Sequence, residues 1–421
     1  MNSSLTLIFC GIVLWFLVSG MMRPDRVYQF PFLAGVITFA FILPQLPGVS
    51  TDPFMPDGAY VKTMIMGILC LLMLRLGWSE KAKPFEFLNV TLDERKLLMV
   101  AGFFSIIGAY FYLQLSRLPG ELTVGVQQSG VSVMYLFFAR LLTYGLVISS
   151  LCFARRRSLP ALAIILFDLI FYFDRIIITG KRAEAIELIL ILVLPYWFMH
   201  RWAVPRIAVI AGLVVGTVAM VSMGDYREIT RAHPQENWNA IADIDFEGNF
   251  KRTLENGGEE MRNAVLRINQ TDRTLKFDYG KFHWNRIVFN YVPAQLVGAE
   301  LKQSLLFTLP TVGRGYTPST GSTETGMADA FQSFWYFGAF KFLLLSWLMV
   351  RIWNAAMAGM AAGQIIYILS IVPAMHAISH QTDWVVTIWV HIALFLAPAL
   401  VYAMASRQQV ASVNMMRLQP A

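Results

Sequence analysis

Long apolar runs recur along this chain and leave few folds open to it. A bilayer core is roughly 30 Å thick, so a spanning helix needs about 20 mostly apolar residues. Hydrophobic residues make up 56% of the chain and charged residues only 14%, which is typical of a protein surrounded by lipid. We therefore expect one all-α polytopic membrane protein with about 11 transmembrane helices. The predicted spans cover residues 5–22, 27–46, 61–78, 97–115, 131–153, 159–178, 181–200, 206–223, 331–350, 360–379 and 384–405.

Basic residues in the connections predict the orientation of these helices. Alternate connections and the tail carry 14 of them: Arg23, Arg26, Lys81, Lys83, Arg95, Lys96, Arg155, Arg156, Arg157, Arg201, Arg206, Arg351, Arg407 and Arg417. The other short connections hold only Lys62, Arg117, Lys181 and Arg182. The positive-inside rule puts the first set in the cytoplasm, with the N-terminus outside and the C-terminus inside. The formal charge of +7 thus reflects orientation and does not indicate a nucleic-acid partner.

One connection is far longer than the others and divides the chain into residues 1–223, 224–330 and 331–421. Residues 224–330 carry 26 of the 61 charged residues, and the helix count places them outside the cytoplasm. Loops of this length usually fold or function. We expect residues 249–270 to be helical and solvated, residues 282–301 to form an amphipathic segment on the membrane, and residues 313–326 to be open.

The opening of the seventh predicted helix combines charges with a helix N-terminus. Lys181 and Arg182 are the paired basic residues of a short outward connection, and Thr179 is the expected N-cap. The helix dipole repels cations there unless an anion joins them, so a phosphate would satisfy the whole group. Alternatively, both side chains reach lipid headgroups or pair with Glu184 and Glu187. Either glutamate could instead act as a general base.

Further polar residues are expected at the same membrane depth, which predicts an outward-facing polar chamber. They are Asp174, Arg175, Arg227, Arg231, His376, His380, Asp383 and His391. Nearer mid-membrane, we expect Arg140 and Asp168 to form a structural ion pair, because burying either charge alone is costly. A proton or ion pathway is the alternative interpretation of that pair.

Other motifs add weaker signals. Arg286 and Arg314 in the long loop stand beside aromatic residues and could bind sugar or phosphate. Gly212 and Gly216 form a GxxxG pattern, which favours helix packing. Cys10, Cys70 and Cys152 lie in apolar runs, so we expect no metal site and no disulfide. No phosphate-binding loop, dinucleotide fingerprint or nucleophile elbow is present in the sequence.

The arrangement resembles bacterial O-antigen polymerases, the Wzy-like oligosaccharide repeat-unit polymerases, which are related to O-antigen ligases. Three local patterns carry the resemblance. TGKRAE at residues 179–184 is similar to the start of a family helix, GDYR at 224–227 to the entry of the loop, and the segment 319–340 to its exit into an aromatic helix start.

The resemblance implies a GT-C-like, metal-independent glycosyltransferase without a cofactor, in the bacterial inner membrane. Such an enzyme joins undecaprenyl-diphosphate-linked oligosaccharides on the periplasmic face, for O-antigen or exopolysaccharide assembly. Membrane lipid and a chain-length regulator protein are the further partners that it implies. Cations near the leaving diphosphate would stabilise the transition state.

Roles for individual residues follow from the resemblance together with the predicted chamber. Lys181, Arg182, Arg227 and Arg231 are expected to bind the diphosphate, with Arg286 and Arg314 as helpers from the loop. The acceptor hydroxyl needs a base, and Glu184, Glu324 and His380 are the candidates. A ligase that transfers the chain to lipid A core is the nearest alternative function. A transporter or flippase for a lipid-linked saccharide, with Arg140 and Asp168 along its path, is the alternative of another class.

Overall fold

The structure is a computed structural model that describes residues 2–118, 131–232, 238–292, 294–310 and 324–405. Helices dominate these residues, and no β-strand forms among them beyond an isolated bridge between Leu92 and Met404. The first half contains α1 (Asn2–Met21), α2 (Phe30–Ile37), α3 (Leu46–Thr51), α4 (Ala59–Gly77), α5 (Glu94–Ser116), α7 (Val131–Ala139), α8 (Leu141–Arg155), α9 (Leu159–Phe173), α10 (Arg182–His200) and α11 (Arg206–Val221).

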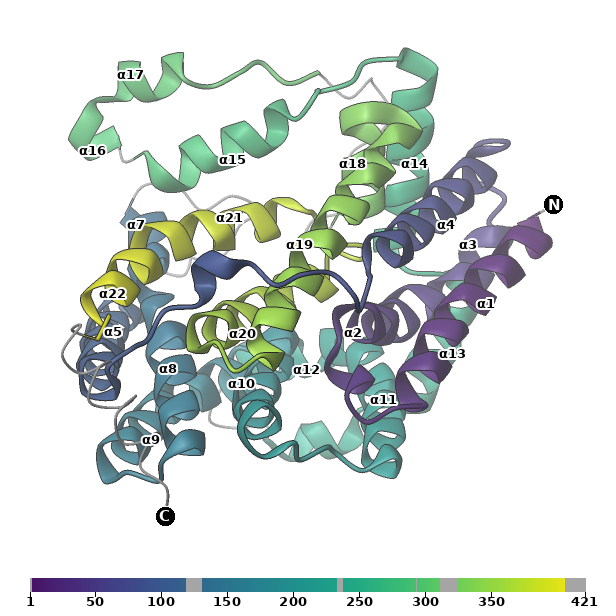
Figure 1. Cartoon of the computed structure of the whole chain (residues 1–421). Helices are drawn as coiled ribbons and strands as arrows, with labels where there is room; N and C mark the ends of the chain where they lie inside the picture. Colours follow the sequence, from purple (N-terminus) through teal and green to yellow (C-terminus); the bar gives the residue numbers. More distant parts are fainter. Residues whose placement is uncertain (1, 119–130, 233–237, 293, 311–323, 406–421) are drawn as a thin grey trace.

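The second half contains the helices of the long loop and the last part of the membrane domain (Figure 1). The loop helices are α12 (Met223–Ala232), α13 (Phe246–Asn256), α14 (Glu259–Thr274), α15 (Lys281–Tyr291), α16 (Ala294–Val297) and α17 (Ala299–Ser304). They are followed by α18 (Gly326–Phe334), α19 (Phe340–Met357), α20 (Ala361–Met375), α21 (Asp383–His391) and α22 (Ala397–Tyr402). Short 3₁₀ or π-helical turns join several of these, including Thr38–Ile42 after α2 and Asp174–Ile178 after α9.

The chain is an all-α, multi-pass membrane protein. Within the described residues, eight helices are long and apolar enough to cross a bilayer, and α11 with the start of α12 makes a ninth if this pair, bent by 60°, is one span. The two other predicted spans fall on α20, which is only 15 residues long, and on α9 with its π-helical turn, which carries Asp168, Asp174 and Arg175. Each predicted span therefore falls mainly on helical residues.

The connections between helices gather at two opposite ends of the molecule. At one end, Glu80 pairs with Arg23 and Arg26, and Arg201 donates to the carbonyl of Met357. These connections belong to the set that is rich in basic residues. The long loop gathers at the other end, where Lys62 pairs with Asp272. The connections fall into these two groups because successive helices run through the bundle in alternating directions.

The long loop packs on the membrane domain at a point where two backbones nearly touch. A Cβ atom added to Gly48 would lie 2.0 Å from the amide nitrogen of Gly257, which itself has a φ of 73°. Beside this contact, the amide of Met261 donates to Oε1 of the buried Gln45 over 3.0 Å. Neither backbone has room for a side chain here, so glycine is required on both.

The expectation of a solvated helix at residues 249–270 is wrong in one respect. The segment is helical, but it forms α13 and α14 with a break at Gly257, and α14 buries an apolar stripe against the bundle. Met261, Ala264, Val265 and Ile268 make this stripe and are nearly inaccessible to solvent. Their spacing of three and four residues is the pattern of a helix that packs on one face.

The expected amphipathic segment corresponds to α15, α16 and α17. α15 lies beside α21 (Figure 1), where the hydroxyl of Tyr291 donates to the carbonyl of Thr387. Trp284 leaves 45% of its surface exposed, and Leu301 and Phe307 are also exposed. Most of the predicted open segment at residues 313–326 lies outside the described residues.

Replacing Gly48 by alanine is expected to lower the thermal midpoint of the detergent-solubilised protein. The new methyl group would overlap the backbone of Gly257 and Glu255, and overpacking of this kind costs about 1–3 kcal/mol. Gly11→Ala is the matched control, because a Cβ atom there meets nothing within 4 Å. Size-exclusion chromatography with thermal challenge measures both variants, and equal midpoints would contradict the close packing.

Candidate functional site

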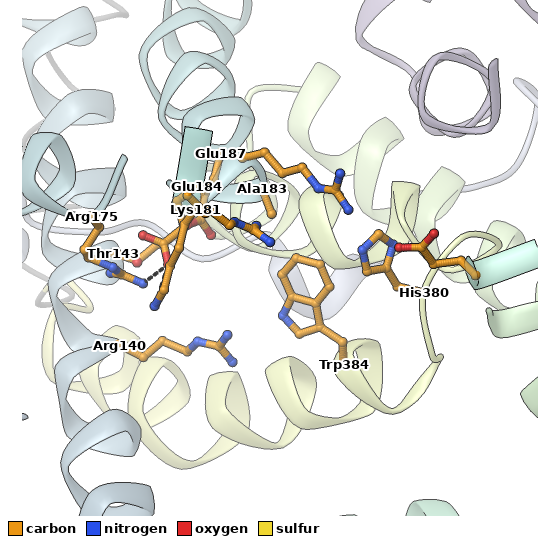
Figure 2. A pocket seen from close by; sticks show the side chains of 12 residues that line it. Arg140, Thr143, Arg175, Lys181, Ala183, Glu184, Glu187, His380 and Trp384 are labelled. Carbon is orange, nitrogen blue, oxygen red and sulfur yellow. Dashed lines mark hydrogen bonds and ion pairs between the residues drawn. The ribbon is translucent and has the colours of Figure 1, made fainter. Parts of the chain in front are cut away.

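A polar cavity of about 260 Å³ lies where α10 begins, beside the turn between α20 and α21. Side chains from the membrane helices and from the loop line it: Arg140, Thr143, Arg175, Lys181, Arg182, Ala183, Glu184, Glu187, Arg227, Glu260, His380 and Trp384. Figure 2 shows Arg140 and Arg175 on one side and His380 on the opposite side. Eight residues named in the sequence analysis thus meet in one cavity: Arg140, Arg175, Lys181, Arg182, Glu184, Glu187, Arg227 and His380.

Glu184 is held by two cations. Its Oε1 atom accepts a hydrogen bond from Arg175 and lies 3.5 Å from Nζ of Lys181. The side chains of Glu184 and Arg175 are 12% and 17% exposed, so this is a buried ion pair. These contacts hold Glu184, Arg175 and Lys181 together as one cluster in the wall of the cavity.

Arg182 faces the cavity with its guanidinium plane set by two contacts. Nη1 donates to the carbonyl of Met220 over 3.1 Å, and the guanidinium carbon lies 4.7 Å from the centre of the Phe41 ring. Met220 belongs to the last turn of α11, where carbonyls lack partners within the helix. Arg182 therefore supplies a hydrogen-bond donor to a carbonyl at the end of α11. Its remaining N–H groups are available to an anion.

Glu187 lies one turn further along α10 and is held differently from Glu184. Oε2 accepts a hydrogen bond of 3.1 Å from the hydroxyl of Tyr172, which also contacts the hydroxyl of Thr143 over 2.8 Å. No described cation lies within ion-pair distance of Glu187. Glu187 is therefore a cavity-lining carboxylate whose described hydrogen-bond partner is a hydroxyl group rather than a cation.

His380 forms the opposite wall with an aromatic environment. Its ring stacks on Phe41, with the ring centres 5.3 Å apart, and Nδ1 lies 2.9 Å from Oγ of Ser379. Burial holds the pKa of His380 well below its ordinary value, and the neighbouring His376 and Arg182 lower that pKa further. The imidazole is therefore neutral near pH 7.

The first two patterns quoted for the family resemblance touch each other. Gly180 adopts a φ of 62°, and its carbonyl accepts a hydrogen bond of 3.1 Å from Nε of Arg227. The hydroxyl of Tyr226 donates to the carbonyl of Ile177 over 2.6 Å. α12 thus fixes the backbone that leads into α10, and the left-handed conformation at Gly180 explains the glycine.

The expected N-cap at Thr179 is wrong. α10 begins at Arg182, and its N-cap residue is Lys181, whose side chain makes no capping hydrogen bond. The hydroxyl of Thr179 instead donates to the carbonyl of Arg175. The first amides of α10 consequently lack a side-chain cap next to the cavity.

The expected ion pair between Arg140 and Asp168 does not form. Asp168 is fully buried and accepts a hydrogen bond of 2.8 Å from Oγ of Ser105, whereas Arg140 lines the cavity. Hydropathy could not give the rotation of each helix about its axis. Arg140 is therefore a site residue that the sequence interpretation assigned elsewhere.

Two other predicted site residues do not line the cavity. Arg286 pairs with Asp383, with 3.1 Å between Nε and Oδ2. Glu324 lies 3.5 Å from Arg267 and accepts a hydrogen bond of 2.7 Å from Gln381. Arg231 lies on α12, but its side chain falls outside the described part, as does all of Arg314.

A buried network near the cavity was missed at the sequence level. Oδ2 of Asp329 accepts hydrogen bonds from the amide and hydroxyl of Thr382, and Oδ1 lies 3.0 Å from Nζ of Lys341. Nε2 of His283, on α15, lies 2.7 Å from the hydroxyl of Thr382. The network ties α15 and α18 to the turn that carries His380. Glu260 of the loop was also missed, because its place at the cavity depends on tertiary packing.

An apolar groove of about 550 Å³ adjoins the polar cavity and shares Arg182 with it. Residues of α2, α10 and α11 line the groove, which follows α10 from Arg182 to Val193. These positions are about 16 Å apart at 1.5 Å per residue. Gly212 and Gly216 also line it, and a Cβ atom added to either meets nothing within 4 Å. Within the described residues, the GxxxG face therefore does not make the close helix contact that the pattern predicts.

The polar cavity and the apolar groove together suit a ligand that joins an anionic group to an apolar chain. Five basic side chains outnumber three carboxylates around the polar cavity, while the groove offers almost entirely apolar side chains. Among the described residues, no three His, Cys, Asp or Glu side chains gather as a metal site would require. The comparisons with known proteins found no matching family model, no matching curated protein and no matching solved structure.

Replacing Arg175 by glutamine is expected to lower the unfolding free energy by about 3–5 kcal/mol, because Glu184 would lose its closest cation inside a buried site. The double variant Arg175→Gln, Glu184→Gln should lose less than the sum of the two single variants. Thermal denaturation of all four proteins gives the coupling between the residues. Strict additivity would contradict the ion pair.

Proposed function

We propose that this protein is a glycosyltransferase that polymerises lipid-diphosphate-linked oligosaccharides at the outer face of the bacterial inner membrane. One observation carries the proposal, namely that Arg182 lines both the cationic cavity and the apolar groove. A lipid-linked donor has a charged diphosphate joined directly to a long apolar chain. A site for it needs both surfaces with a cation at their junction, and the wall around Arg182 has this arrangement.

In the proposed reaction, an acceptor hydroxyl attacks the anomeric carbon of the donor sugar. The bond from that carbon to the diphosphate oxygen breaks, and the lipid diphosphate leaves with an added negative charge. Arg182, Lys181 and Arg227 would stabilise that charge, with Arg140 and Arg175 completing the positive wall. Their positions along one cavity suit a diphosphate, because guanidinium groups can bind two oxygens at once.

The hydroxyl proton must pass to a base during this step. His380 is neutral and lines the cavity. The hydroxyl of Ser379 donates to the carbonyl of His376 over 3.1 Å, so Nδ1 of His380 donates to Ser379 and Nε2 is left as the accepting atom. Glu187 is the second candidate, and it joins the proposal because of its hydrogen bond from Tyr172. Glu184 now serves to hold Arg175 and Lys181 in position.

Orientation and cellular place belong to the same proposal. The positive-inside rule puts the cavity at the periplasmic side, with the N-terminus there and the C-terminus in the cytoplasm. Oligosaccharide units carried by a lipid diphosphate would reach it within the plane of the membrane, and a chain-length regulator would be its protein partner. Transfer of the chain to lipid A core is the second candidate, since a ligase would use the same donor site.

A transporter function has less support from the described residues. Its path would need polar groups facing one another through the middle of the membrane. Asp168 is instead fully buried and bound by Ser105, away from Arg140. The polar side chains around Arg140 instead gather in the cavity where α10 begins.

Replacing Arg182 by alanine is expected to abolish polymer formation, because loss of one preorganised donor typically lowers a rate by about 10²–10³. Polysaccharide chain length in a complemented deletion strain measures this, with the variant's membrane content checked by immunoblot. Arg252→Ala is the matched control, since Arg252 is exposed on α13 and away from the cavity. Normal chain lengths in the Arg182 variant would contradict the proposal.

The reaction class can be tested with purified protein and a diphosphate-lipid oligosaccharide, with and without lipid A core. Longer lipid-linked oligosaccharides identify a polymerase, and a product on lipid A core identifies a ligase. We expect the first product, also in the presence of EDTA. A strict metal requirement would contradict the proposed role of the basic side chains.

Filling the apolar groove is expected to slow the reaction only for donors with a long lipid chain. Gly212→Leu adds a side chain where a Cβ atom meets no other atom, so it should be tolerated by the fold. The rate with a polyprenyl donor should fall at least about tenfold, whereas a donor with a short prenyl chain should react as with the unaltered protein. Equal losses for both donors would show that the groove does not hold the chain.

A further inference from the structure

A second large cavity lies at the opposite end of the bundle from the cavity beside α10. Its volume is about 540 Å³, and it opens between the last turn of α1, the start of α2 and the last turn of α4. The connections around it belong to the set rich in basic residues. None of its lining residues enters the proposed transfer reaction.

The walls of this cavity carry uncompensated positive charge. Arg26, Arg75 and Lys81 line it, with Glu80 as the one carboxylate among the lining residues. Glu80 is already engaged by Arg23 and Arg26. Arg75 donates to the carbonyl of Trp78, and neither Arg75 nor Lys81 forms an ion pair with a described carboxylate. Two cations are therefore left for an anion from outside the chain.

Aromatic residues add a second, independent feature. The guanidinium of Arg75 lies 5.3 Å from the centre of the Trp15 ring, which fixes the cation at the cavity wall. Trp78 also lines the cavity and is only 5% exposed, yet its Nε1 atom has no hydrogen-bond acceptor among the described residues. A buried indole N–H normally has an acceptor, so Trp78 offers an unused donor to a ligand in this cavity.

The surface beside the cavity is apolar and faces away from the bundle. Leu14, Val18 and Met22 follow one another at intervals of four residues along α1 and are 47%, 49% and 66% exposed. Leu76, at the end of α4, is 67% exposed and lines the cavity itself. This stripe lies on two helices that can cross a bilayer, so lipid chains cover it.

We propose that this cavity binds the phosphate headgroup of an anionic phospholipid, with its acyl chains along the exposed stripe of α1. The phosphate would lie between Arg75 and Lys81, and the indole N–H of Trp78 would donate to a headgroup oxygen. An anionic lipid fits better than a zwitterionic one, because choline or ethanolamine would bring a positive charge toward two uncompensated cations. The site is independent of the proposed transfer reaction.

Native mass spectrometry of the full chain from nanodiscs with equal phosphatidylglycerol and phosphatidylcholine tests the site. Phosphatidylglycerol should remain bound in preference to phosphatidylcholine. Arg75→Gln with Lys81→Gln should weaken this retention about thirtyfold, which corresponds to about 1 kcal/mol for each basic residue near an anionic headgroup. Unchanged retention in the double variant would overturn the proposal.

Lys83→Gln is the matched control for Lys81→Gln, because both lysines are exposed in the same connection but only Lys81 lines the cavity. Retention should fall in Lys81→Gln and persist in Lys83→Gln, and this pair keeps the test valid if the double variant misfolds. An equal loss of lipid retention in the two lysine variants would show that the basic surface attracts anionic lipid in general, and it would overturn the proposed site. Displacement of the lipid by millimolar inorganic phosphate would assign the cavity to free phosphate instead.

Discussion

The ion pair of Glu184 with Arg175, extended by Lys181, is the interaction on which the candidate site depends. Charges are costly near the membrane interior, and five basic side chains in one cavity could not be held together without compensation. Glu184 offsets two of them through a single oxygen atom. It thereby joins the π-helical turn after α9 to the first turn of α10. The remaining cations can then face the cavity without being drawn to that carboxylate.

Much of the fold could be predicted because a bilayer fixes the length of the helices that cross it. Each predicted span falls mainly on helical residues, and the connections separate into two ends as alternating helices require. The loop was less predictable. α14 is polar enough to suggest a solvated helix, but its stripe from Met261 to Ile268 is buried by contacts that no local pattern reveals. Gly48 and Gly257, 209 positions apart, meet only in the folded chain.

The candidate site, like the fold, could be predicted from the sequence only in part. Lys181, Arg182, Glu187 and His380 could be grouped because all were expected at one membrane depth, and they do line one cavity. Depth alone does not say which way a side chain points. Arg140 was consequently assigned a partner on the wrong side of its helix. Arg286 could bind an anion and Glu324 could act as a base, but each forms an ion pair away from the cavity. Those ion pairs form only in the folded chain.

The hydrogen bond from Arg182 to the carbonyl of Met220 has a consequence for the long loop. Met220 lies just before the 60° bend between α11 and α12, and α12 in turn holds the backbone at Gly180 through Arg227. The same contact thus links the Arg182 guanidinium to the last turn of α11, next to the bend. An anion that turns the Arg182 guanidinium away from Met220 would alter the end of α11 beside the bend. Conversely, a protein that binds the long loop and moves α12 would change the affinity of the cavity for the anion. Thermodynamic linkage would make these two effects equal in free energy, so binding at the long loop and binding in the cavity would be coupled.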